Sequence, residues 1–140
     1  MQLQPVRNIT RESFGKYGTV IELTPACSDG WEVVVEAPVN GWRIAVLEFS
    51  RKSAKRLENH PTSKESFVPL VGTAILFAAE NSAPEKFEAF LLDKPVCLNE
   101  GVWHEVISLS EVSQVKITEN LTVDSSYYML PCEAAVQLTY

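Results

Sequence analysis

The stretch Pro95-Val-Cys-Leu-Asn-Glu-Gly101-Val-Trp-His104-Glu-Val-Ile-Ser-Leu109 places a glycine, a tryptophan and a histidine before an alternating apolar run. Glycine permits a tight turn with a positive φ, and the alternation after Gly101 is typical of a half-buried strand. The segment therefore predicts a turn that delivers His104 to the mouth of a β-structure.

The only other histidine of the chain stands in a similar setting. His60 lies in the segment Asn59-His60-Pro61-Thr-Ser-Lys-Glu65-Ser-Phe-Val-Pro-Leu70, which also passes from turn residues into an apolar run. Because Pro61 restricts its neighbour to an extended backbone near a loop, one interpretation is that the His60 side chain points outward. Both histidines of the protein thus lie in segments that pass from a turn into a strand.

Short apolar segments separated by turn residues recur along the rest of the chain. Thr10 is expected to cap a short helical turn, Ser82 to Phe87 to form another, and Asn40-Gly41 to form a hairpin turn. We expect strands at residues 19–23, 31–36, 42–49, 66–71, 73–79, 114–118, 127–130 and 133–140. Many short strands with little helix predict an all-β sandwich or barrel.

Two segments invite a more specific interpretation. The almost continuous apolar run at residues 73–79 predicts a strand buried on both faces, inside a barrel or sandwich or under a subunit contact. Residues 50–58 are polar and include four cationic side chains, Arg56 among them. They form either a solvated loop or a cationic lip that attracts an anionic substrate.

Length, charge and cysteine content limit the possible functions. The 140 residues fit a single domain, and the net charge of −6 argues against a nucleic acid or an anionic membrane as partner. Three cysteines without metal-type spacing suit a reducing compartment. The amino terminus lacks the apolar run of a signal peptide, and no segment is long enough to span a bilayer. We therefore expect a cytoplasmic protein with a small-molecule ligand.

Three segments in order resemble the ureidoglycolate lyase family, formerly called ureidoglycolate hydrolases. They are Glu12-Ser-Phe-Gly-Lys-Tyr-Gly-Thr-Val-Ile-Glu22, then His60-Pro61 followed by Phe67-Val-Pro-Leu70, and finally Val102-Trp103-His104. The resemblance implies an all-β, cupin-like antiparallel jelly-roll barrel with one or two short helical turns, as one domain over residues 1–140. It also implies a homodimer, cleavage of ureidoglycolate into glyoxylate and urea in the recovery of purine nitrogen, and a divalent metal such as nickel or manganese.

Several polar positions depart from the family's pattern. Glu65 replaces a glutamine of the central motif, Glu105 replaces a second histidine after His104, and Thr118-Glu119 stand where the family has an aspartate and an arginine. The turn before His104 keeps the glycine of the wider cupin pattern and lacks its proline. Because the replaced positions are polar, these departures affect the expected identity of the substrate more than the expected fold.

Cleavage of a carbinolamide such as ureidoglycolate needs a base, an acid and a group that holds the carboxylate. His104 is the candidate base, because imidazole changes its charge near neutral pH. Glu65 or Glu105 is the candidate acid if burial raises its pKa, and His60 completes the catalytic candidates. Candidate substrate-binding residues are the cations Lys64 and Arg56 and the aromatic side chains Trp103 and Phe67.

A bound metal ion would change these roles. His60, Glu65 and His104 are then the ligand candidates, and the metal polarises the substrate hydroxyl. The chain lacks the His-X-His pair that metal-binding cupins use.

The leading hypothesis is a lyase-like enzyme that binds a small carboxylate metabolite in the barrel mouth. The alternatives are a non-catalytic cupin that binds a metabolite or serves in assembly, and a metal-dependent cupin enzyme with another substrate.

Overall fold

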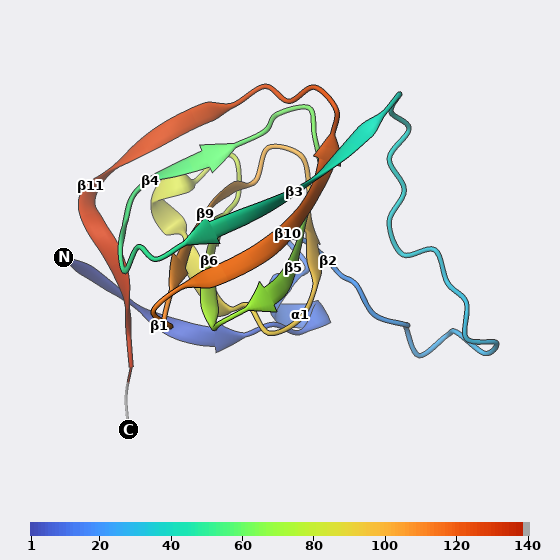
Figure 1. Ribbon diagram of the computed structural model, residues 1–140, viewed down its shortest axis with the longest axis horizontal. Coiled ribbons are helices and arrows are strands. Elements are labelled where there is room, and N and C mark those ends of the chain that lie inside the picture. The colour runs from blue at the N-terminus through green and yellow to red at the C-terminus, as the bar shows by residue number, and fades with distance from the viewer. Residues whose placement is uncertain (139–140) are drawn as a thin grey trace.

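The computed structural model describes residues 1–138, which are built almost entirely from strands (Figure 1). The helical elements are the short α1 (Arg11–Phe14) and the 3-10 turn η1 (Pro84–Lys86). The strands are β1 (Gln2–Asn8), β2 (Gly18–Val20), β3 (Trp42–Phe49), β4 (Ala54–Asn59), β5 (Glu65–Val71), β6 (Ala74–Ala79), β7 (Glu88–Leu91), β8 (Val96–Leu98), β9 (Trp103–Ser108), β10 (Ser113–Asn120) and β11 (Ser126–Gln137). The predicted all-β architecture with one or two short helical turns is confirmed.

The strands form two sheets that face each other. Six of them close a barrel in the order β1-β11-β4-β9-β6-β7, and five form a sheet in the order β2-β8-β5-β10-β3. β1 pairs in parallel with β11 and with β7, while the other pairs are antiparallel. One apolar core fills the closed barrel, and a second lies between its wall and the five-stranded sheet.

β6 contributes to both cores. Its residues alternate between them, so that Leu76 packs between the two sheets and Phe77 packs inside the closed barrel. Every residue of the strand is buried, which confirms that residues 74–79 are covered on both faces. Because this burial is complete within one chain, the run supplies no surface for a subunit contact.

The amino-terminal turn forms as the capping residues predict. Thr10 Oγ1 accepts a hydrogen bond from Ser13 N, and Ser13 Oγ accepts one from Thr10 N, each at 2.9 Å. The turn directs Phe14 against Tyr17 and Phe90 in edge-to-face contacts with ring centroids 5.8 and 5.1 Å apart. α1 thereby closes one end of the core between the sheets.

The predicted strand at residues 31–36 and the hairpin after it are wrong. Residues 21–41 are irregular and reach away from the body between β2 and β3 (Figure 1). β2 and β3 are opposite edges of the five-stranded sheet, so no hairpin can join them directly. β2 itself is shorter than predicted, since its partner β8 has only three residues.

The solvated-loop interpretation of residues 50–58 is also wrong over much of its length. Ala54–Asn59 forms β4, which pairs with β11 and β9 in the barrel wall. The predicted strands at 127–130 and 133–140 are one strand, β11, with an irregular register between Met129 and Ala134, and residues 139–140 lie outside the described residues. β1 and β7 were not predicted. None of the helices within residues 1–138 has the length and apolar character needed to cross a membrane.

We expect Gly18→Ala to destabilise the fold strongly. A Cβ at this position would lie 2.0 Å from the carbonyl oxygen of Cys97, so β2 and β8 would have to separate. The free energy of unfolding, measured by urea denaturation, should fall by about 2–3 kcal/mol. Thr19→Ala in the same strand is the control and should cost less than about 1 kcal/mol. Equal losses of unfolding free energy in the two variants would contradict the close approach of Gly18 to the Cys97 carbonyl.

Candidate functional site

A polar pocket of about 360 Å³ opens between the two sheets. Three arginines, four glutamates and both histidines of the chain line it, together with a few apolar side chains such as Phe67. A larger groove of about 610 Å³ lies on the outer face of the five-stranded sheet and is mostly apolar. Titratable groups gather in the smaller pocket, which is therefore the candidate for chemistry.

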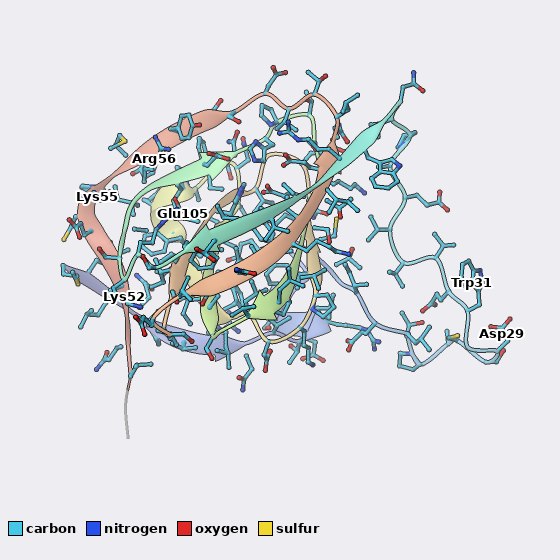
Figure 2. The ribbon with its side chains drawn as sticks, in the orientation of Figure 1. Asp29, Trp31, Lys52, Lys55, Arg56 and Glu105 are labelled. Carbon is cyan, nitrogen blue, oxygen red and sulfur yellow. The ribbon has the colours of Figure 1, made fainter. Side chains whose placement is uncertain are left out.

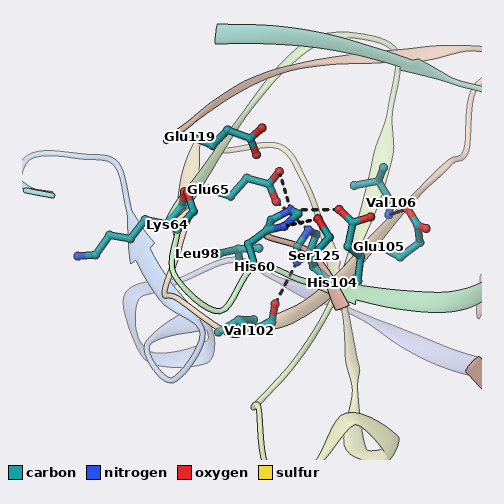
Figure 3. Close-up of polar contacts among 12 residues, drawn as sticks. His60, Lys64, Glu65, Leu98, Val102, His104, Glu105, Val106, Glu119 and Ser125 are labelled. Carbon is teal, nitrogen blue, oxygen red and sulfur yellow. Dashed lines mark hydrogen bonds and ion pairs between the residues drawn. The ribbon is translucent and has the colours of Figure 1, made fainter. Parts of the chain in front are cut away.

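Both histidines and Glu65 meet at the inner end of this pocket (Figure 3). His60 directly follows β4, Glu65 begins β5 and His104 is the second residue of β9. His104 Nε2 lies 2.7 Å from Glu65 Oε1, and His60 Nε2 lies 3.5 Å from Glu65 Oε2. All three side chains are buried. The interpretation that His60 points outward is therefore wrong.

Backbone carbonyls hold the two imidazole rings in place. His60 Nδ1 lies 3.1 Å from the Asp124 carbonyl oxygen, and His104 Nδ1 lies 3.0 Å from that of Val102. A carbonyl can only accept, so each Nδ1 carries a proton and each Nε2 is directed toward Glu65. The Gly101 amide donates to the His60 carbonyl at 3.0 Å, which ties the two histidine segments together. Gly101 has φ 75°, as the predicted turn requires.

Two glutamates that the sequence analysis did not select complete the cluster. Glu58 Oε1 lies 3.0 Å from His60 Nε2, and the Glu119 carboxylate pairs with Arg43 at 2.6 Å. Glu58 precedes His60 by two residues, a spacing that puts both on one face of a strand, but this segment was interpreted as a loop. Glu119 was noticed only as a departure from the family's pattern.

Charges within the cluster shift one another's ionisation. Burial opposes protonation of His60, yet hydrogen bonds to Glu58 and Glu65 raise the pKa of His60 to about 10. Burial likewise opposes charge on His104, but Glu65 raises the pKa of His104. Burial would raise the pKa of Glu65, but His104 and His60 hold it well below its usual range. At neutral pH, Glu65 is therefore an anion beside the His60 imidazolium, and its charge favours the protonated form of His104.

The pKa of Glu119 shifts in the opposite direction to that of Glu65. Burial raises the pKa of Glu119, and its neighbour Glu65 raises it further, against the lowering effect of Arg43. The pocket thus contains two adjacent carboxyl groups, of which Glu65 readily gives up its proton and Glu119 retains one more easily.

Comparison with known families decides what kind of protein this is. The family model described as ureidoglycolate lyase matches residues 1–126. The chain belongs to the ureidoglycolate lyase family. A search of curated proteins finds no match.

Solved cupin-fold structures resemble this family member only distantly. A dTDP sugar isomerase from Desulfovibrio desulfuricans is 12% identical, with 81% of this chain and 83% of that chain covered and a TM-score of 0.49. A sugar 3,4-ketoisomerase from Thermoanaerobacterium thermosaccharolyticum, solved with TDP, is 13% identical over 59% of this chain and 61% of its own, with a TM-score of 0.48. Oxalate decarboxylase of Bacillus subtilis is 12% identical over 64% of this chain and 24% of its own, with a TM-score of 0.47. The chain thus spans less than two thirds of the ketoisomerase and about a quarter of the decarboxylase.

The predicted substrate-binding residues of this family member divide into two groups. Arg56 and Phe67 line the pocket, and the Phe67 ring packs edge-on against His104. Lys64 points away from the imidazoles (Figure 3) and donates to the Glu36 carbonyl oxygen at 3.2 Å. Trp103 Nε1 donates to the Asn81 carbonyl oxygen at 3.0 Å, outside the pocket. The cause is strand alternation, since Lys64 and Trp103 each precede an inward residue and therefore face the opposite side.

Glu105, the remaining catalytic candidate, borders the pocket. Its Oε1 accepts hydrogen bonds from Arg51 Nη1 at 2.6 Å and from the Val106 amide at 2.8 Å. Burial raises the pKa of Glu105, although Arg51 and the Val106 amide oppose this shift. Two donors occupy this carboxylate, so it is held apart from the Glu65 cluster.

The cluster fits a divalent metal ion. Glu58, His60 and His104 bring donor atoms within 4.8 Å of one another, and so do His60, Glu65 and Glu119. The predicted ligand set of His60, Glu65 and His104 is divided between these two groups, and each group includes one glutamate that the sequence did not predict. Glu65 Oε1 is buried and, despite its proximity to His104 Nε2, is not aligned for a hydrogen bond with any described group. Imidazole and carboxylate donors suit first-row metals such as manganese or nickel.

The charges of the cluster predict a pH dependence of stability in the metal-free protein. The pKa of His60 is raised to about 10, so its stabilising charge is fully present below the unfolded value near 6.5. This contribution is lost as the pH rises toward about 10. Urea unfolding in EDTA between pH 6 and 10 should show a free energy that falls more steeply in the wild type than in His60→Gln. If the free energies of unfolding of the wild type and of His60→Gln change with pH in parallel, His60 is not an imidazolium stabilised by Glu58 and Glu65.

Proposed function

We propose that this protein cleaves ureidoglycolate, or a closely related small carbinolamide carboxylate, into glyoxylate and urea. The observation that carries the proposal is the Glu65 carboxylate buried between two imidazoles at the inner end of a polar pocket. Membership of the ureidoglycolate lyase family supports the same activity. The enzyme is placed in the cytoplasm as part of the proposal, because its cysteines are free thiols.

Arg56 is positioned to receive the substrate carboxylate. Of the three pocket arginines, Arg43 pairs with Glu119 and Arg51 pairs with Glu105. Within residues 1–138 Arg56 forms no ion pair, and its guanidinium lies over the Tyr127 ring at 4.1 Å. A guanidinium that rests over an aromatic ring keeps its N–H donors available for bidentate binding of a carboxylate.

Glu65 is the group that takes the hydroxyl proton. Loss of this proton lets the C–O bond become a carbonyl while the C–N bond breaks and its electron pair passes to the nitrogen. The sequence predicts that His104 is the base, but Glu65 raises the pKa of His104 and so favours the protonated form, which cannot accept a proton. Glu65 is the ionised carboxylate at the inner end of the pocket, so we assign the role of base to Glu65; its lowered pKa makes it a weak base, which accepts the proton only as the C–N bond breaks.

Glu119 is the group that returns a proton to the departing nitrogen. Burial and Glu65 raise the pKa of Glu119, which favours its protonated form, and Arg43 Nε donates a hydrogen bond to its carboxyl group at 2.8 Å. After the reaction, proton transfer from Glu65 to Glu119 restores both groups. The two carboxyl groups thus divide the roles of base and acid because their surroundings shift their pKa values in opposite directions.

Glu58, His60 and His104 are the residues that would hold a metal ion beside these two carboxyl groups. A bound divalent ion would polarise the hydroxyl oxygen and favour loss of its proton. Metal binding would require both imidazoles to lose their Nε2 protons, and the backbone contacts of the two Nδ1 atoms orient the rings for ligation through Nε2.

The assay that tests the function is release of glyoxylate from ureidoglycolate by purified protein, with and without nickel or manganese. Glu65→Gln should lower kcat by about 10²–10⁴-fold, because the amide cannot accept the proton. Glu85→Gln, at an exposed position in η1, is the matched control and should retain full activity. A well-folded wild-type protein that releases no glyoxylate under any metal condition would refute the lyase. The alternatives would then be a cupin that binds a metabolite without catalysis and a cupin enzyme that acts on another substrate.

The role of Arg56 is tested separately. Arg56→Ala should raise KM for ureidoglycolate by about 10–100-fold, which corresponds to the loss of a charge-assisted hydrogen bond. Lys64→Ala removes a cation that points away from the pocket and should leave KM unchanged. The reverse result would show that the carboxylate binds on the side of Lys64.

A further inference from the structure

Residues 21–41, here called the arm, form an irregular connection that stands away from the body of the molecule (Figure 1). The arm joins β2 to β3, which are opposite edges of the five-stranded sheet. Four spacings between neighbouring strands amount to roughly 19 Å, whereas about 20 extended residues reach some 65–70 Å. Irregular connections of this length are uncommon in compact domains and often functional. The arm is therefore longer than its connection requires, and it forms one wall of the groove of about 610 Å³.

A row of small side chains forms the floor of this groove on the outer face of the sheet. The strand registers place Cys97, Ser66 and Thr118 side by side on β8, β5 and β10. Thr118 is in turn next to the larger Ile44 of β3, and all four residues line the groove. Burial raises the pKa of the Cys97 thiol, which therefore stays neutral. The floor thus offers two hydroxyl groups and no charge.

Large apolar side chains border the groove on the sheet and on the arm. Trp42 and Ile44 lie on the same face of β3 and are 63% and 53% exposed. Val33 and Val35 of the arm line the same groove, and Trp31 lies at the tip of the arm (Figure 2). The second face of an antiparallel sheet is ordinarily polar, so this exposed apolar surface indicates a binding site. Tryptophan side chains favour an aromatic ligand through offset or edge-to-face ring contacts.

The charge that the groove offers to a ligand is positive. Among the described residues that line it, Lys64 is the only cation. Its ammonium group donates to the Glu36 carbonyl oxygen at 3.2 Å and forms no ion pair within residues 1–138. The acidic residues of the lining are already engaged, since Glu32 accepts from the amide and the hydroxyl of Thr24, each at 2.7 Å, and Glu119 belongs to an ion pair of the polar pocket. A single anionic group on the ligand is therefore complementary to the groove.

We propose that the groove binds an aromatic monocarboxylate. The ring lies between Val33 of the arm and Trp42 of β3, and the carboxylate accepts hydrogen bonds from the Lys64 ammonium group and the Ser66 hydroxyl group. Lys64 and Ser66 are two residues apart on an extended segment, so they face the same side. The volume of the groove is typical of small-molecule sites. The site is independent of the proposed catalytic function, because Glu65 and the polar pocket lie on the other face of the sheet.

Isothermal titration calorimetry of the full chain with cinnamate tests the site, and cinnamamide is the neutral analogue. Cinnamate should bind with a Kd below about 1 mM. Cinnamamide should bind at least about tenfold more weakly, because it lacks the charge that pairs with Lys64. No binding of cinnamate, or equal affinities for the two compounds, would overturn the proposal.

Substitution of Lys64 tests the origin of this preference. Lys64→Met removes the charge and keeps an unbranched side chain, so the affinity for cinnamate should fall by about tenfold. The affinity for cinnamamide should stay at the wild-type value, which shows that the groove is intact. Lys55→Met, at an exposed position of β4 (Figure 2), is the matched control and should bind cinnamate as the wild type does. Wild-type affinity for cinnamate in Lys64→Met would overturn the proposal.

Two further variants locate the bound acid. Trp42→Ala removes a ring from the groove and should weaken the binding of both compounds by about tenfold. Arg56→Ala should leave the affinity for cinnamate unchanged, because Arg56 lines the polar pocket. If Arg56→Ala abolishes the binding of cinnamate and Lys64→Met does not, the acid binds in the polar pocket and the proposal is wrong. These titrations do not depend on cleavage of ureidoglycolate, so failure of one proposal does not decide the other.

Discussion

The Glu65 carboxylate between two imidazoles is the constraint on which the organisation of the pocket depends. An ionised carboxylate in a protein interior is costly unless charged partners surround it. His104 and His60 supply those partners, and each needs a proton acceptor behind Nδ1, which the Val102 and Asp124 carbonyls provide. The Gly101 turn that positions β9 is fixed to the His60 carbonyl by a hydrogen bond. The turn, the two histidine segments and the start of β5 therefore form one connected unit.

Much of the fold could be predicted because alternation is a local property of the sequence. Strands such as Trp42–Phe49 and Ala74–Ala79 follow from their apolar pattern alone. β4 was missed because four cations in nine residues look like a solvated segment, although long cationic side chains also occupy the rims of pockets. Residues 31–36 have a strand pattern, but a strand needs a neighbour, and sequence pattern cannot say whether one lies within reach.

The site was predictable to the same extent. His60, Glu65 and His104 were selected as isolated chemical types near turns, and the structure brings them together. Glu58 and Glu119 were not selected, because their approach depends on the pairing of β4 with β9 and of β10 with β5. Lys64 and Trp103 show the reverse problem, since a displacement of one residue along a strand moves a side chain to the other face.

The departures from the family's pattern make physical sense as a set. A glutamine at position 65 would leave His104 without its carboxylate partner and His60 with Glu58 alone, whereas Glu65 raises the pKa of both imidazoles. Glu105, in place of a histidine, pairs with Arg51, and Glu119, in place of an arginine, pairs with Arg43. Each acidic replacement thus contacts a cation of the pocket and holds it in place. Arg56 forms no ion pair within the described chain, and the anionic substrate that we propose would supply the missing negative charge.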